Sequence, residues 1–140
     1  MYASVNDIKD DWKKINFDDV NAIITVQKVE NMIIQETDYI NSWISNKYIV
    51  PVSEIDSPIA FNVLKRICIF RVSERIRNII EVKTGEKQNK NYSRTPNSDL
   101  RDIQKGTMQL IDAIRNKSGT SSFNVDSGKC FEFDTSKQQW

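Results

Sequence analysis

Four groups of neighbouring acidic residues have the types and spacing that could do chemistry. They are Asp10-Asp11, Asp18-Asp19, Glu36-Asp38 and Glu132-Asp134. Paired carboxylates can transfer protons to and from a substrate, or bind a hard cation such as Mg²⁺. Where such a pair begins a helix it has another use, because a carboxylate there accepts hydrogen bonds from unpaired backbone amides. We expect the capping role for the pairs at helix starts.

Residues that catalysis and metal binding commonly need are absent or isolated. The chain has no histidine, which is the commonest general base and zinc ligand. Its two cysteines, Cys68 and Cys130, are too few for a disulfide framework, and its four glycines are too scattered to form a phosphate-binding loop. The sequence therefore predicts neither an enzyme nor a cofactor or metal site.

Composition favours one soluble domain without an overall electrostatic preference. The chain has 140 residues, of which 39% are hydrophobic, and its formal net charge is +1. This charge gives no global attraction to nucleic acid or to an anionic membrane. No apolar run reaches the roughly 18 to 20 residues of a membrane span, and the N-terminus lacks the features of a signal peptide. We expect a protein that stays in the compartment where it is made.

Hydrophobic periodicity predicts four helices that form one domain over residues 1–117. The first helix covers about residues 4–14, with Ser4 as its N-cap and Asp7 in an imperfect capping-box position. The second helix covers residues 19–46, and its apolar positions recur at spacings of three, four or seven. They are Ile23, Val26, Ile33, Thr37, Ile40, Ile44 and Tyr48.

The third helix, expected from Pro58 to Lys83, changes its apolar side halfway along. Its first-half apolar residues are Ile59, Val63, Leu64, Ile67, Cys68 and Phe70, and those of the second half are Val72, Ile76, Ile79 and Ile80. Either a kink or another helix of the same chain accommodates the far half, or one side contacts another subunit. For a subunit interface the candidates are Arg71, Val72, Arg75, Ile76, Ile79 and Ile80.

The sequence of residues 84–140 indicates a loop, a fourth helix and a tail. Residues 84–99 have no hydrophobic period and indicate a loop. A helix capped by Ser98 or Asp99 should then continue past Gly106 to about residue 116, with a stripe of Leu100, Ile103, Thr107, Leu110, Ile111 and Ile114. Residues 118–140 form a tail that is either a short hairpin or loose. Its large aromatic residues, which either fold back on the domain or anchor in a partner, are Phe123, Phe131, Phe133 and Trp140.

The two long helices carry opposite charge. Residues 19–46 hold one lysine against four acidic residues, a net charge of −3, and residues 58–83 hold six basic against two acidic residues, a net charge of +4. This contrast favours pairing within the chain or between neighbouring subunits. The alternative is a small helical nucleic-acid-binding or regulatory protein, although a larger positive charge and a known docking motif are missing. Its candidate contact residues are Arg66, Arg71, Arg75 and Arg77.

Three segments together resemble one protein family. They are MYASVNDI at the start, TDYINSWISNKYIVPV at the end of the second helix, and LKRICIFRVSERI in the third. In order and spacing they are similar to the small head–tail connector, or neck adaptor, proteins of Mu-like bacteriophages and prophages. The similarity covers about residues 1–117 and includes the basic-Tyr pair Lys47-Tyr48 and the nearby Pro51. The polar loop 84–99 and the extended tail depart from the family pattern.

The resemblance implies a structural virion protein that links the capsid portal to the next neck or tail component. It implies a mainly helical subunit of a homo-oligomeric ring in the virion neck, made in the bacterial host cytoplasm. In isolation such a subunit is expected to be a monomer or small oligomer, with no membrane contact and at most indirect contact with DNA. The resemblance also implies that a C-terminal segment docks on the portal. The residues expected to do so are Phe123, Phe131, Phe133 and Trp140.

Overall fold

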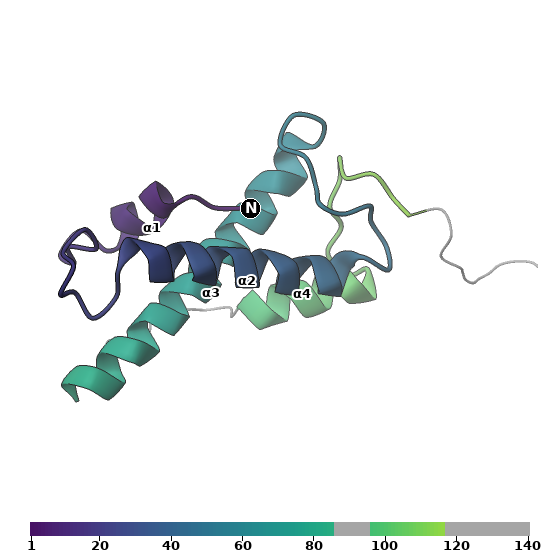
Figure 1. The fold of residues 1–140 in the computed structure, drawn as a ribbon. Helices are drawn as coiled ribbons and strands as arrows, with labels where there is room; N and C mark the ends of the chain where they lie inside the picture. The colour runs from purple at the N-terminus through teal and green to yellow at the C-terminus, as the bar shows by residue number, and fades with distance from the viewer. Residues whose placement is uncertain (86–95, 117–140) are drawn as a thin grey trace, which may run out of the picture.

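In the part of the chain that the structure describes, four helices pack together (Figure 1). The computed structural model describes residues 1–85 and 96–116. The helices are α1 (Val5–Asp11), α2 (Val26–Ile44), α3 (Pro58–Thr84) and α4 (Pro96–Lys105). These described residues form no sheet, and the mainly helical fold class is confirmed. The predicted tail, residues 118–140, lies outside them, so its separation from the helical domain stays a prediction.

The starts of α1 and α2 are set by local capping. The capping box predicted at the first helix is confirmed, because the Ser4 side chain accepts from the Asp7 backbone amide and the Asp7 carboxylate accepts from the Ser4 amide at 2.7 Å. The second helix begins later than predicted, at Val26, with Thr25 as its N-cap. Residues 13–24 form a loop instead, so the expectation that Ile23 lies on the stripe of a helix is wrong.

The long helix α3 matches its predicted bounds and buries different sides in its two halves. In the first half Leu64 and Cys68 are completely buried, and in the second half Val72 and Ile76 are. At 3.6 residues per turn a step of four advances by about 40°, so these four side chains form one ridge that drifts around the helix. Their buried neighbours extend it on different flanks, Ala60 and Ile67 in the first half and Ser73 and Arg77 in the second. The buried side therefore turns gradually along the helix, and the predicted change of apolar side is confirmed only in part.

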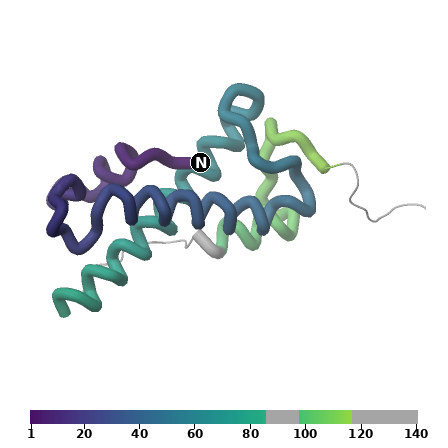
Figure 2. Tube along the Cα trace, viewed as in Figure 1, coloured from purple at the N-terminus to yellow at the C-terminus, as the bar shows by residue number. Residues whose placement is uncertain are grey.

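Other parts of the same chain cover both sides of α3. The helix crosses behind α2, and its C-terminal half extends toward the end of the molecule that carries α1 and the loop before α2 (Figure 2). In its first half Phe61 packs edge to face on Tyr2, with ring centroids 5.6 Å apart. In its second half Ser73 accepts a hydrogen bond from the Trp12 indole at 3.2 Å. The chain itself therefore covers the far half as far as Arg77, whereas Ile79 and Ile80 are only half-buried and Val82 is exposed. Beyond Arg77 the second predicted explanation, contact with another subunit, stays a prediction.

The last helix is shorter than its periodicity predicted. It ends at Lys105 because Gly106 adopts a φ of +85°, the left-handed conformation that commonly terminates helices. Beyond this point Leu110 is buried, but Ile111 and Ile114 are exposed. The predicted helical stripe through residue 114 is therefore wrong after Gly106.

Candidate protein-docking surface

The segment after α4, residues 110–116, is hydrogen-bonded to the loop that follows α2. The backbone amide of Ile49 donates to the Ile114 carbonyl at 2.8 Å. The backbone amide of Leu110 donates to the Tyr48 hydroxyl at 3.1 Å, and both of these residues are buried. An isolated antiparallel bridge between Tyr48 and Arg115 continues the contact. Two stretches about 65 residues apart in sequence are thus held side by side without regular secondary structure.

Asp112 attaches the same segment to the start of α3. Its Oδ2 accepts from the Ile59 amide at 2.8 Å and its Oδ1 from the Ala60 amide at 2.7 Å. Ser57, the residue at the N-cap position, makes no such bond and instead donates its hydroxyl to the Asp112 carbonyl at 2.7 Å. A carboxylate distant in sequence therefore satisfies the free amides of this helix end and lies where the helix dipole favours negative charge.

Four exposed isoleucines lie on the segments that these hydrogen bonds hold together. They are Ile49, Ile59, Ile111 and Ile114, called the isoleucine surface below. Their side chains are between 53% and 82% exposed. A single exposed isoleucine is ordinary, and four on segments that are hydrogen-bonded to one another make this region a candidate for protein interaction. Because the backbone here is anchored at both ends, the region can present these side chains without reorganising first.

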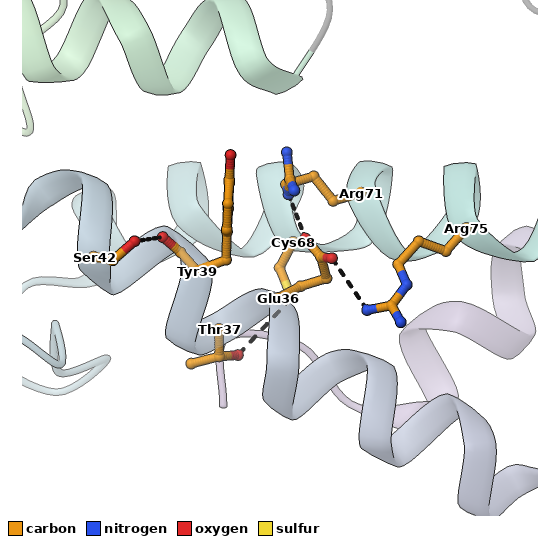
Figure 3. A network of polar contacts seen from close by, with 7 residues as sticks. All are labelled: Glu36, Thr37, Tyr39, Ser42, Cys68, Arg71 and Arg75. Carbon is orange, nitrogen blue, oxygen red and sulfur yellow. Dashed lines mark hydrogen bonds and ion pairs between the residues drawn. The ribbon is translucent and has the colours of Figure 1, made fainter.

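The charged residues of the two long helices are directed toward each other. Glu36 of α2 is only 6% exposed, and its carboxylate accepts from Arg71 Nε and from Arg75 Nη1, the latter at 3.2 Å (Figure 3). The Arg71 guanidinium also lies over the Tyr39 ring, 4.1 Å from its centroid. The pairing within the chain that the opposite helix charges indicated is therefore confirmed for this carboxylate.

A neutral hydrogen-bonded group borders this ion pair. Thr37 Oγ1 accepts from the Tyr2 amide at 3.2 Å. The same oxygen lies 4.0 Å from Cys68 Sγ, and Figure 3 draws this second contact. The Tyr2 hydroxyl donates to Asn41 and accepts from the Val52 amide at 3.0 Å. Burial raises the pKa of the Cys68 thiol to about 11, and burial also raises the pKa of Tyr2 despite the bond from Val52. Both groups are protonated at neutral pH, so Cys68 is not poised as a nucleophile.

The arginines of the nucleic-acid alternative are mostly engaged inside the chain. Arg77 is 7% exposed, contacts the Glu74 carboxylate and lies with its guanidinium 5.8 Å from the Trp12 ring centroid. Arg71 and Arg75 bind Glu36 as described above, and Arg66 is exposed. A nucleic-acid phosphate would have to compete with these carboxylates, which disfavours the alternative.

The residues predicted for a subunit interface divide by burial. Val72 and Ile76 are completely covered by the chain itself, so a second subunit cannot reach either side chain. The two arginines of that set face Glu36. Ile79 and Ile80 are half-buried and still reach the surface. An interface on this part of α3 stays a prediction, and it is narrowed to these last two residues.

The predicted tail aromatics lie outside the described residues. They are Phe123, Phe131, Phe133 and Trp140. Sequence reasoning missed the isoleucine surface because it placed Ile111 and Ile114 on a buried helical stripe. Gly106 was the available signal. If the helix ends at this glycine, Ile111 and Ile114 are no longer part of its buried stripe.

Comparison of the chain with protein-family models, with curated proteins and with solved structures finds no match. Membership of the head–tail connector family therefore stays a prediction, which rests on the three sequence segments quoted above. Within residues 1–85 and 96–116 no group of acidic or cysteine side chains could hold a metal ion. Within the same ranges no helix combines the length and the apolar character that crossing a bilayer requires.

Proposed function

We propose that this protein is a structural adaptor of a phage neck, which docks on the capsid portal and joins it to the next neck or tail component. The isoleucine surface is the observation that carries the proposal. It offers a partner apolar side chains on a preformed backbone, whereas the arginines of α3 are largely paired internally. The similarity of residues 1–117 to connector proteins supplies the kind of partner.

The last described residue, Asn116, lies beside the isoleucine surface, and this position supports docking of a partner there. Residue 117 follows directly after Asn116, whose amide donates to the Lys47 carbonyl at 2.8 Å next to Ile49 and Ile114. Phe123 is seven residues farther along, within a maximum reach of about 23 Å. A partner bound at the isoleucine surface therefore lies within reach of the tail, and in the proposal the tail aromatics bind that partner as well.

Co-purification with the portal protein encoded beside this chain tests the proposal. We expect the wild-type chain to bind the portal and the double variant Ile111→Ser with Ile114→Ser to lose most of the binding, because the variant removes half of the isoleucine surface. The matched control is Ile34→Ser, which changes an isoleucine of α2 that is 46% exposed and does not belong to the isoleucine surface. Failure of the wild-type chain to bind the portal would refute the adaptor role.

The tail is tested separately from the isoleucine surface. The double variant Phe131→Ser with Phe133→Ser should weaken portal binding while the helical domain retains its stability.

A DNA-binding assay tests the nucleic-acid alternative. Binding of the chain to DNA that weakens with added salt and with Arg66→Glu would favour this alternative. The two experiments separate the functions because one changes apolar contacts and the other changes an exposed charge.

A further inference from the structure

The bridge between residues 47–49 and 114–116 leaves one backbone edge open. Two hydrogen bonds, both 2.8 Å long, flank its central pair of Tyr48 and Arg115. In an antiparallel pair of this kind the N–H and C=O of the central residues point away from the partner stretch. The Arg115 amide and carbonyl are therefore directed outward, and no hydrogen bond from the described residues reaches them. Such an edge can accept one more strand.

The same pairing places Ile49 and Ile114 side by side. These residues lie directly opposite each other next to the central pair, so their side chains project from the same face. Tyr48 and Arg115 project from the other face, where the Arg115 guanidinium lies 5.7 Å from the centroid of the buried Tyr48 ring. Ile49 is 53% exposed and Ile114 is 55% exposed. A strand added at the open edge extends this apolar face.

The sequence that follows residue 116 has the signals of a return strand. Ser118-Gly119 is a turn-forming dipeptide. A two-residue turn at this dipeptide joins the residues on either side of it, with the Thr120 amide donating to the Lys117 carbonyl. Hydrogen-bonded pairs alternate along an antiparallel ladder, so the pair formed by Arg115 and Ser122 is then hydrogen-bonded as well. The outward direction of the Arg115 backbone agrees with this register.

We propose that residues 120–123 return along residues 114–117 as an added strand, so that Phe123 lies beside Ile114 and enlarges the isoleucine surface. In this register Phe123 and Ile114 form a non-hydrogen-bonded pair, in which side chains approach each other most closely. Ile49, Ile114 and Phe123 then form one apolar row across three short strands. A slip by one residue turns Phe123 to the opposite face, so the apolar row specifies the register.

The added strand comes from the same chain because of where the described part ends. The chain leaves the bridge at Asn116, and only a two-residue turn separates the two paired stretches, so closing the loop costs little entropy. A short tether also gives an effective concentration on the order of millimolar, which a strand from another molecule does not reach in dilute solution. Three strands with an apolar face are more stable than two.

This strand deepens the proposed adaptor role, on which it rests for the identity of the partner. Phe123 was expected to bind the portal as part of a separate tail. In the proposed register it belongs to the same docking surface as Ile49 and Ile114 and reaches the partner together with them. A preordered aromatic side chain at this position loses less conformational entropy on binding than one on a free tail.

Disulfide exchange tests the register in the isolated full chain. Both variants carry Cys130→Ser, so the buried Cys68 is the only natural thiol that remains. Ile114→Cys with Phe123→Cys places two thiols in the proposed pair, and Ile114→Cys with Asn124→Cys is the matched control, because residue 124 faces the other side. In glutathione buffer we expect the intramolecular disulfide to be favoured about fivefold in the first variant over the control, as measured by mass spectrometry.

Two results of this experiment would overturn the proposal. Equal disulfide fractions in the two variants would show that residues 114 and 123 are not paired. Disulfides between two chains, seen as dimers on a non-reducing gel, would assign the added strand to a second copy. Circular dichroism of both variants checks that the helical fold is retained.

Hydrogen exchange tests the added strand without new cysteines. The Arg115 amide should exchange about fivefold more slowly in the wild-type chain than in Gly119→Val, because valine opposes the positive φ that the turn requires. The matched control is Gly128→Val, which changes another glycine of the tail and should leave this rate as in the wild-type chain. Equal rates in all three proteins would refute the strand.

Neither measurement needs a portal, so the strand and the adaptor role are tested independently. An unprotected Arg115 amide in a chain that binds the portal rejects only the strand. A protected amide in a chain that does not bind the portal rejects the adaptor role. If both hold, Gly119→Val should weaken portal binding about two- to fivefold, since Phe123 loses its fixed position. Undiminished binding of this variant would show that Phe123 does not belong to the docking surface.

Discussion

The centre of the molecule and its isoleucine surface place side chains in opposite ways. At the centre Glu36 is buried and binds two arginines of α3, whereas at the isoleucine surface Ile111 is 82% exposed. Charge faces inward in one region and apolar surface faces outward in the other. Buried ion pairs add little net stability because both groups lose their hydration, but they fix how two helices are aligned.

In the proposed adaptor the docking surface consists of apolar groups, and the contrast between these two regions supports that assignment. The arginine-rich helix looked from its sequence like a binding face, yet its charges mainly position α3 against α2. The isoleucines, in contrast, have no role in the core. The segments that carry them are joined by backbone hydrogen bonds and by the Asp112 carboxylate, which accepts from the Ile59 and Ala60 amides.

Removal of the buried carboxylate should have the largest effect. Glu36→Ala leaves Arg71 and Arg75 facing a region without their partner, and we expect the free energy of unfolding to fall by about 3 kcal/mol. Urea denaturation measures this change. The control is Asp38→Ala on the exposed side of the same helix, which should change stability by less than about 0.5 kcal/mol. Equal losses for the two variants would mean that the centre is not organised by this ion pair.

Alkaline pH should weaken the centre through Cys68. Burial raises its pKa from 9.0 to about 11 in the folded chain, so the unfolded chain releases the proton first as pH rises. Stability from this group is complete below pH 9 and is lost between pH 9 and 11, by a total on the order of 2 kcal/mol. Urea titrations across this range should show the fall, and Cys68→Ala should flatten it. Identical slopes for both proteins would contradict the assignment.

Removal of the Asp112 cap should destabilise the start of α3 and loosen the isoleucine surface at the same time. Asp112→Ala removes both side-chain acceptors from the start of α3, and we expect a loss of about 1 kcal/mol in unfolding free energy. Hydrogen exchange should accelerate at Ile59, Ala60 and Ile49 before it does at α2. Asp56→Ala provides the control, because this nearby carboxylate caps no helix. Unchanged exchange at these amides would show that Asp112 does not hold the surface in place.

The variant Ile111→Ser should change stability least and reduce portal binding most. Ile111→Ser alters an exposed side chain, so stability should change by less than about 0.5 kcal/mol. Ile40→Ala in the buried core should cost about 3 kcal/mol by the same urea assay. Portal binding should fall for Ile111→Ser and persist for folded Ile40→Ala. The reverse ranking in stability would mean that Ile111 belongs to the core.

Several elements could be predicted because their determinants are local. Ser4 and Asp7 form the capping box that their spacing indicated, and α3 follows its pattern from Pro58 almost to its last residue. The boundaries that failed involve competition between similar signals. Asp19 and Thr25 could both cap a helix and the structure uses Thr25, and Gly106 could be either tolerated within a helix or used to end one.

The sequence by itself determined the helical class, the two-sided pattern of α3 and the opposite charges of the long helices, because periodicity and composition act over neighbouring residues. Only the tertiary structure decided that Glu36 lies between Arg71 and Arg75, and that Asp112 caps a helix more than fifty residues away. Burial and pairing depend on which segments meet in space. For the same reason the exposed isoleucines became recognisable as a surface only after the chain was folded.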